Sequence, residues 1–216
     1  MAAKHPLPYR VYLDITNKCP NLCLHCYTDS IRSSEEELGL DELKDLVQQM
    51  AAMGIYNLVI TGGEPFTRTD LFDLLWFCKE NKIEAMVITS GVLLDHLKIK
   101  ALRDTKTHLR ISIDGVSETT HDYVRGIGAF KGFLDAIKLV KQEKFDDVSV
   151  HFTLNRMNLK ELLLLPGFLN EIGIREVTLS TIKPMGRARK HPELLIEPAL
   201  VLFARERIKL IFQNKN

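Results

Sequence analysis

The stretch YNLVITGGEP, residues 56–65, decides the fold, because a short apolar strand pattern in it runs directly into a glycine turn. Its centre, LVI at 58–60, has the apolar, β-branched composition of a strand. Beyond the proline, residues 70–79 carry apolar side chains three or four apart, as a helix with one buried face does. Thr69 or Asp70 is placed to cap that helix. The stretch therefore predicts one unit of strand, loop and helix.

The same unit recurs along the chain in both directions from this stretch. Further β-rich runs lie at residues 9–15, 82–89, 108–113, 148–154 and 175–180. Helical spacing follows them at residues 40–53, 93–102, 130–142, 158–172 and 197–212. Strands joined by crossover helices run parallel, and the crossovers are right-handed. We therefore expect an α/β fold of the partial (β/α)6 TIM-like barrel type, two units short of a closed barrel.

Composition indicates an ordinary soluble globular protein. The chain has 216 residues, 45% of them apolar and 26% charged, with a formal net charge of +1. We expect one domain over residues 1–216, no nucleic-acid surface, no secretory signal and no membrane span, and hence a cytoplasmic location. The four cysteines would be reduced in the cytoplasm, so a metal site or catalysis is a better explanation for them than disulfides.

Every unusual short sequence follows the end of a predicted strand. In a parallel α/β fold these ends lie at one edge of the sheet, where ligands bind. We therefore interpret them as a single site. In chain order they are the cysteines Cys19, Cys23 and Cys26, the segment TGGEP at 61–65, TSG at 89–91, SIDG at 112–115, Asn155, and KPMGRA at 183–188.

Three close thiols suit an iron–sulfur cluster that has one iron left open for another ligand. The spacing CxxxCxxC in a loop after the first strand resembles the radical S-adenosylmethionine (radical SAM) superfamily, and the resemblance extends over about residues 9–190. A zinc site made by the three cysteines and His25 is the alternative. A zinc site would not explain the unusual sequences of the other five loops.

The resemblance implies a role for each loop in binding SAM. The amino group of SAM would meet the segment Gly62, Gly63 and Glu64, because glycines allow close approach and a carboxylate suits an ammonium. The carboxylate of SAM would pair with Arg125. The complete set of implied cofactor contacts is Tyr27, Gly62, Gly63, Glu64, Pro65, Thr89, Ser112, Asp114, Arg125, Asn155 and Met185, with the two hydroxyls of the ribose assigned to Ser112 and Asp114 and the adenine to the neighbourhood of Tyr27 and Met185.

Strand alternation predicts a polar inner face. Ser112 and Asp114 lie two apart and share a face, whereas Ile111 and Ile113 point to the helices. The same parity places further polar side chains inward, and His151 among them has either a structural or a functional role. These further residues are Arg110, Ser149, His151, Thr153 and Asn155.

Several positions depart from the pattern of the family. His25 stands where a large aromatic residue is usual, and Ser90 replaces a commoner asparagine, which weakens the case for a specific role of Ser90. Cys78 is expected to be a buried small hydrophobe. Many relatives continue into a cysteine-rich extension called SPASM or twitch, whereas no cysteine follows Cys78 here. Either the protein is a minimal stand-alone form of the family, or the chain is a truncated one.

The resemblance implies a 4Fe-4S cluster and SAM as cofactors, and an oxygen-sensitive enzyme. A 5′-deoxyadenosyl radical would remove hydrogen from the substrate after reduction by a low-potential donor, either flavodoxin or ferredoxin. We expect a peptide or protein substrate. The alternatives are a tetrapyrrole or small metabolite, a non-catalytic iron–sulfur scaffold, and a zinc-stabilised module that touches RNA through the basic run at 183–191.

Overall fold

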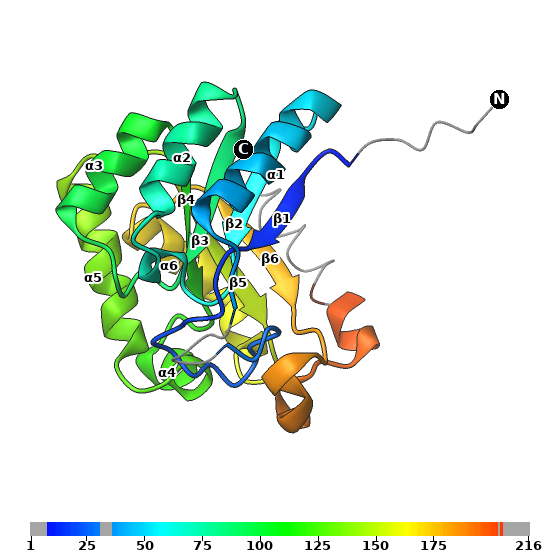
Figure 1. Cartoon of the computed structure of the whole chain (residues 1–216). Coiled ribbons are helices and arrows are strands. Elements are labelled where there is room, and N and C mark those ends of the chain that lie inside the picture. The colour runs from blue at the N-terminus through cyan, green and yellow to red at the C-terminus, as the bar shows by residue number, and fades with distance from the viewer. Residues whose placement is uncertain (1–7, 31–35, 203, 205–216) are drawn as a thin grey trace.

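The computed structural model describes residues 8–30, 36–202 and 204. Six strands form one sheet in the order β1-β2-β3-β4-β5-β6, and each pairs in parallel with the next. The sheet curls into a half-barrel (Figure 1). This confirms the predicted α/β class and partial barrel, while the single domain over the whole chain stays a prediction. The strands are β1 (Val11–Asp14), β2 (Asn57–Thr61), β3 (Glu84–Thr89), β4 (His108–Ile113), β5 (Val148–Leu154) and β6 (Val177–Thr181).

The described helices cover the convex face of the sheet (Figure 1). One apolar core fills the layer between helices and sheet, and Cys78 lies in it as a fully buried side chain, as predicted. Burying apolar area in this way is the main favourable contribution to folding. The helices are α1 (Leu40–Met53), α2 (Leu71–Glu80), α3 (His96–Thr105), α4 (Glu118–Arg125), α5 (Ala129–Gln142) and α6 (Leu165–Glu171), with short 3-10 turns η1 (Pro65–Thr67), η2 (Leu159–Leu163), η3 (Gly186–Lys190) and η4 (Pro192–Leu194).

Alternation along the strands separates the core from the concave face. Leu109, Ile111 and Ile113 of β4 belong to the apolar core, so Arg110 and Ser112 between them point to the other side. The same holds for the remaining strands. The outer residues are Val11 and Leu13, Leu58 and Ile60, Ala85 and Val87, Val150, Phe152 and Leu154, and Val177 and Leu179. The predicted inner face is therefore confirmed.

Caps fix where the helices begin. Asp95 accepts a hydrogen bond from the backbone N–H of Lys98 at 2.8 Å, so α3 begins at His96, three residues later than predicted. Asp70 precedes α2 as expected, but its carboxylate pairs with Arg68 at 2.6 Å and does not bond the helix backbone.

One helix was not predicted from the sequence, and another was predicted with the wrong extent. Helix α4 was not foreseen, because its buried side is formed largely by His121, Val124 and Arg125 and carries no apolar period. The helix predicted over 158–172 is divided into η2 and α6, with Pro166 in the first turn of α6, where a missing N–H costs least. The helix predicted over 197–212 lies largely outside the described residues.

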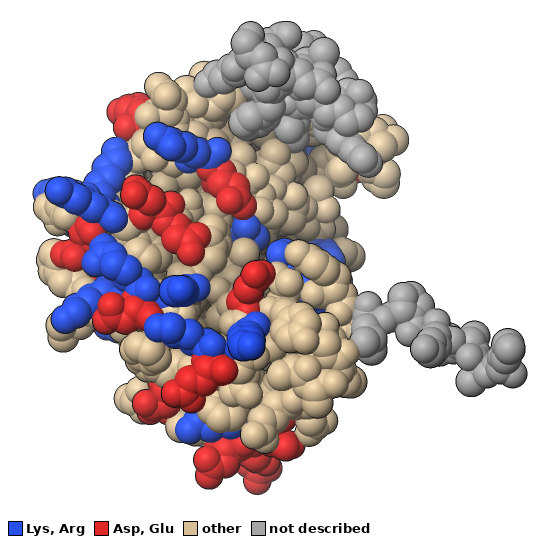
Figure 2. Space-filling model, turned by 90° about the horizontal axis from the view of Figure 1, so that it is seen from above, with Lys and Arg blue, Asp and Glu red and all other residues tan. Residues whose placement is uncertain are grey.

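Charged side chains of both signs are interspersed over the helical side of the molecule, as the view from above shows (Figure 2). No helix in the part of the chain that the structure describes is long and apolar enough to cross a membrane.

Candidate active site

The loops after β1 and β2 are joined by main-chain hydrogen bonds. Gly63 N donates to Thr16 O at 2.7 Å and Glu64 N to Lys18 O at 2.8 Å. A Cβ on Gly62 would lie 2.4 Å from Thr16 O, and one on Gly63 would lie 2.1 Å from Lys18 O. Only glycine permits this approach. The two glycines thus admit the backbone that leads to Cys19, and their contact with a ligand stays a prediction.

Glu64 is a buried carboxylate, only 1% exposed. It accepts hydrogen bonds from Thr89 Oγ1 at 2.7 Å and from both the backbone N–H and the hydroxyl of Ser90, at 2.9 and 2.6 Å. These donors fix the carboxylate, and no Lys, Arg or His side chain of the described residues forms an ion pair with it. Ser90 therefore has a structural role that the sequence did not indicate, because the backbone after β3 and this hydroxyl both hold Glu64.

The three thiols lie on one loop and are not in disulfides. Burial, together with the charges of Cys23 and Glu64, raises the pKa of Cys19 to about 11. Burial also raises the pKa of Cys23, against the opposing effect of the nearby Arg125. For Cys26, burial is outweighed by hydrogen bonds from Thr28 and Ser30, and its pKa is lowered. Cys26 is thus the thiol that ionises most readily.

Asp114, at the end of β4, is completely buried and ties the cysteine loop to α4. Its Oδ2 accepts hydrogen bonds from His25 Nε2 at 2.6 Å and from Arg125 Nε, and its Oδ1 accepts one from the backbone of Thr153 at 3.2 Å. Burial alone would raise the pKa of this carboxyl, but Arg125 and then His25 hold it well below its usual range. The binding of ribose by Asp114 stays a prediction.

His121 lies behind this ion pair in the wall of the site. Its Nδ1 accepts a hydrogen bond from the backbone N–H of Asp114 at 3.1 Å. Burial, and then the charge of Arg125, lower the pKa of His121 to about 4. The ring is therefore neutral near pH 7 and serves as an acceptor.

Arg187 in η3 clamps the cysteine loop, and sequence reasoning missed it. Its Nη1 donates to Cys23 O at 2.9 Å, its Nη2 donates to Ser30 O at 2.5 Å, and its Nε pairs with Asp29 at 3.0 Å. Its backbone N–H donates to Cys26 O at 2.8 Å. The only signal in the sequence was its place within the segment at 183–188, which carries no hint of these partners.

Gly186 permits that clamp. A Cβ there would lie 2.4 Å from Tyr27 O, and the residue has a φ of +54°. The loop after β6 therefore reaches the cysteine loop, which brings Met185 and Tyr27 to the same region. Tyr27 donates its hydroxyl to Asp14 at 2.7 Å. Their contact with adenine stays a prediction.

Asn155 is buried and serves the turn after β5. Its Oδ1 accepts hydrogen bonds from the backbone of Met157 at 2.9 Å and of Asn158 at 3.2 Å. Its Nδ2 donates to Thr153 O at 3.2 Å. Pro65 begins η1 directly after Glu64. These contacts give both residues a local structural role beside the predicted cofactor role.

A single-ion site such as zinc has no support in the structure. Among residues 8–30, 36–202 and 204, no three Cys, His, Asp or Glu side chains converge on a position that could hold one ion. His25, the proposed fourth zinc ligand, directs its Nε2 to Asp114. A four-iron cluster is larger than one ion and spreads its thiolates around itself, so it does not need three ligands that converge on one position.

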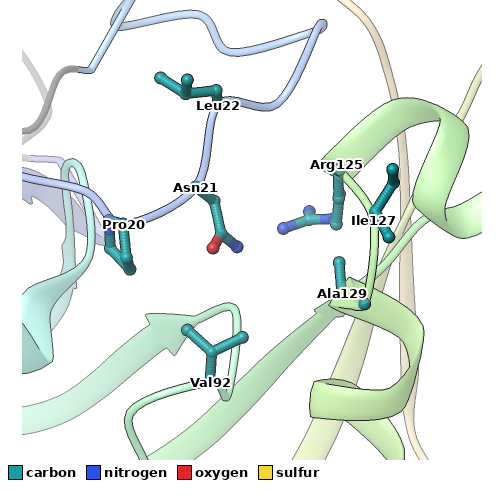
Figure 3. A pocket seen from close by; sticks show the side chains of 9 residues that line it. Pro20, Asn21, Leu22, Val92, Arg125, Ile127 and Ala129 are labelled. Carbon is teal, nitrogen blue, oxygen red and sulfur yellow. The ribbon is translucent and has the colours of Figure 1, made fainter.

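The residues fit a 4Fe-4S cluster with SAM. Cys19 receives a hydrogen bond from the backbone of Asn21, and Cys26 receives one from Ser30 N at 3.4 Å. Such bonds stabilise thiolates and tune clusters. The positive charge of Arg125 acts on Cys19 and Cys23. A cavity of about 290 Å³ opens beside this loop, and Figure 3 shows Asn21 and Arg125 pointing toward one another across it.

Comparisons with known proteins agree with this arrangement. The model of the radical SAM superfamily matches residues 13–169. An AdoMet-dependent heme synthase of Methanosarcina barkeri is 29% identical over 90% of this chain and 56% of its own length. A PqqA peptide cyclase of Rhizobium meliloti is 28% identical over 88% of this chain and 51% of its own. This chain thus spans about half the length of the curated relatives it matches.

A solved structure has the same fold. Streptococcus suis SuiB, crystallised with its precursor peptide SuiA, superposes with a TM-score of 0.80 at 16% identity, over 96% of this chain and 47% of SuiB. At that identity the likeness concerns the fold alone. The family match, in contrast, extends over more than half of this chain and includes the cysteine loop, Glu64, Asp114 and Arg125. The chain belongs to the radical SAM superfamily.

Proposed function

We propose that this protein is a radical SAM enzyme that modifies a peptide or protein. When bound, the cluster and SAM supply one-electron cleavage of SAM and removal of hydrogen from the substrate. A low-potential donor, flavodoxin or ferredoxin, delivers the electron. The residues of the chain bind and orient these cofactors: the three cysteines hold the cluster, Glu64 takes the amino group of SAM, and Arg125 takes its carboxylate.

The concave face of the sheet supports a peptide as the substrate, because its two halves differ in chemistry. On β4 to β6 every inward side chain is polar, whereas on β1 to β3 half of the inward side chains are apolar or aromatic and these lie at the middle of the face. The apolar or aromatic residues are Tyr12, Val59, Met86 and Ile88, the polar inward residues of β1 to β3 are Asp14, Asn57, Thr61 and Glu84, and those of β4 to β6 are His108, Arg110, Ser112, Ser149, His151, Thr153, Thr178 and Ser180. A peptide has the same two features, apolar side chains and a main chain that forms hydrogen bonds.

The polar half is nearly neutral. Arg110, its one cation among the described residues, donates to Ser149 at 2.9 Å and to Glu176 at 3.1 Å. Burial lowers the pKa of His151 to about 4, so this ring is neutral near pH 7. Its Nε2 meets Ser180 at 2.7 Å. Neutral donors and acceptors suit main-chain amides better than the carboxylates of a tetrapyrrole.

A tetrapyrrole is the second candidate substrate. The heme synthase relative favours it, because that protein matches this chain as well as the peptide cyclase does. A flat apolar ring would lie against the half formed by β1 to β3. Its carboxylates would then need Arg110, which is already paired with Glu176.

Deuterium transfer distinguishes the two candidates. Cells grown in heavy water yield a peptide fraction and a tetrapyrrole fraction, and each is incubated anaerobically with the reconstituted, reduced protein and SAM. Mass spectrometry then measures deuterium in 5′-deoxyadenosine. We expect deuterium from the peptide fraction only. Transfer from the tetrapyrrole fraction alone would replace the proposal with the second candidate.

Two controls complete this experiment. Cys23→Ala should abolish 5′-deoxyadenosine formation altogether, because the open-iron cluster needs all three thiolates. Cys78→Ala should leave it in place, since Cys78 is buried in the apolar core away from the loop. Absence of 5′-deoxyadenosine from the wild type with a full complement of iron would favour the non-catalytic scaffold.

A further inference from the structure

One buried polar group in the described part of the chain has no partner. It is the side-chain amide nitrogen of Asn21, between the first two cysteines. A buried donor without an acceptor is costly and rare in folded proteins, so this atom calls for a partner from outside the chain. Asn21 lines the cavity of about 290 Å³ between the cysteine loop and the turn from α4 to α5.

Arg125 presents a second set of free donors to the same cavity. Its Nε is taken by Asp114, which fixes the direction of the guanidinium. Its two terminal nitrogens have no hydrogen-bond partner among the described residues. Figure 3 shows the guanidinium of Arg125 and the amide of Asn21 facing one another across the cavity. Two converging donor groups, one of them cationic, favour an acceptor with negative charge.

The rest of the cavity wall restricts what that acceptor belongs to. Pro20, Leu22, Val92, Ile127 and Ala129 line it with apolar surface, and they supply no cation. The site can therefore hold one small anionic group beside the cluster loop. A carboxylate fits this description, and SAM carries one in its methionine part.

We propose that Asn21 is a SAM-positioning residue, whose amide donates to the carboxylate of SAM from the side opposite Arg125. The carboxylate would then be held by a neutral and a charged donor, which fixes its orientation as well as its place. This inference rests on SAM binding, as the proposed function does, but not on the identity of the substrate.

The test compares SAM with decarboxylated SAM. Binding of each to the reconstituted, anaerobic protein is measured by equilibrium dialysis, without any peptide. For Asn21→Ala we expect the Kd of SAM to rise about tenfold, the usual result of losing one hydrogen bond to a charged group. The Kd of decarboxylated SAM should not change.

Two results would overturn the proposal. Equal weakening of both ligands would mean that Asn21 shapes the loop and does not touch the carboxylate. A shift in the midpoint potential of the cluster without SAM, in Asn21→Ala, would mean that the amide donates to a cluster sulfide instead. We expect the potential, and the electron paramagnetic resonance spectrum without SAM, to match those of the wild type.

A second variant covers a failure of the first to fold. Asn21→Asp has nearly the same shape but replaces the donor with a negative charge, so it should weaken SAM more than Asn21→Ala does. Decarboxylated SAM should bind to it at least as well as to the wild type. Asn170→Asp adds the same charge at an exposed position of α6 and should alter neither affinity. Loss of SAM affinity in this control would contradict the assignment.

Discussion

At the scale of single residues, the site is organised by buried groups of opposite charge. Asp114 is the centre, because it meets Arg125 from α4 and His25 from the cysteine loop. Both ions of the pair with Arg125 are out of water, so each offsets the cost of burying the charge of the other. Position 25, which is usually aromatic in the family, is thus occupied here by a histidine that forms a hydrogen bond with Asp114.

Asp114→Asn should destabilise the cluster-free protein strongly. The change leaves the buried guanidinium of Arg125 without a counter-charge, and breaking such a pair costs about 3–5 kcal/mol. Urea unfolding followed by circular dichroism measures the effect. Asp135→Asn, which removes an exposed partner of Lys131, should change almost nothing. Equal losses of stability from the two substitutions would show that the buried pair contributes no more to the free energy of unfolding than the exposed pair does.

His121 should make stability depend on pH. Its pKa is about 4 in the folded protein and 6.5 in the unfolded chain, so the unfolded chain binds the extra proton first. The contribution of the neutral His121 to the free energy of unfolding is fully present above pH 6.5. It is lost as pH falls toward 4, and its size is on the order of 3 kcal/mol. His121→Asn keeps an acceptor for Asp114 N but does not titrate. Urea midpoints across this range should therefore decline less steeply in the variant.

At the scale of elements, the cysteine loop is held from several sides by other parts of the chain. The loop after β2 bonds the backbone ahead of Cys19, α4 bonds Leu24 through Val124 O at 2.8 Å, and η3 contributes Arg187. A loop that must bind a bulky cofactor without moving needs such support, because its own residues form no regular hydrogen-bond ladder. The cysteines are positioned by elements far away in the sequence.

Arg187→Ala should lower the iron content of the reconstituted protein. It removes the donors to Cys23 O and Ser30 O and the ion pair with Asp29, so the loop loses its clamp. Iron per chain after desalting measures the effect. Arg189→Ala is the matched control, since Arg189 bonds only Pro184 O in the described chain. If the two variants retained equal iron, the clamp would have no influence on the cluster.

At the scale of the whole molecule, the half-barrel has two unequal kinds of strand. The strands β2 to β5 each pair on both sides, whereas β1 and β6 pair on one side only within the described residues. An edge strand exposes one row of backbone groups and opens at a lower free energy than a central strand.

Hydrogen exchange should reveal this difference. We expect the slowest amides in β2 to β5 and faster exchange in β1 and β6, as measured by mass spectrometry or NMR on the cluster-free protein. Reconstitution with iron and sulfide should then slow the amides of residues 19–26. Exchange in β6 as slow as in β4 would show that something else covers this edge.

The sequence allowed the sheet and its inner face to be predicted, because both follow from local periods. The alternation in HLRISI at 108–113 is enough to place Ile111 toward the helices and Ser112 toward the concave face. The parallel order then follows from the crossover helices. The cysteines are close in the sequence, so their loop could be located as well.

The supporting contacts could not be predicted, because they join loops that are distant in sequence. His25 and Asp114 are 89 residues apart, and Arg187 and Cys23 are 164 apart. Nothing in a local pattern indicates that these side chains meet. Ser90 illustrates the same limit, since its role depends on the hydrogen bond to Glu64 from another loop and not on the residues next to it in the sequence.

The two unlike halves of the concave face have a consequence for the handedness of the product. A flexible chain that lies across this face has one favourable orientation, because the reversed orientation would bury amides against the apolar side chains of Met86 and Ile88. Hydrogen would then be taken from one side of a given carbon only. A substrate with two mirror-related hydrogens should therefore yield a single stereoisomer.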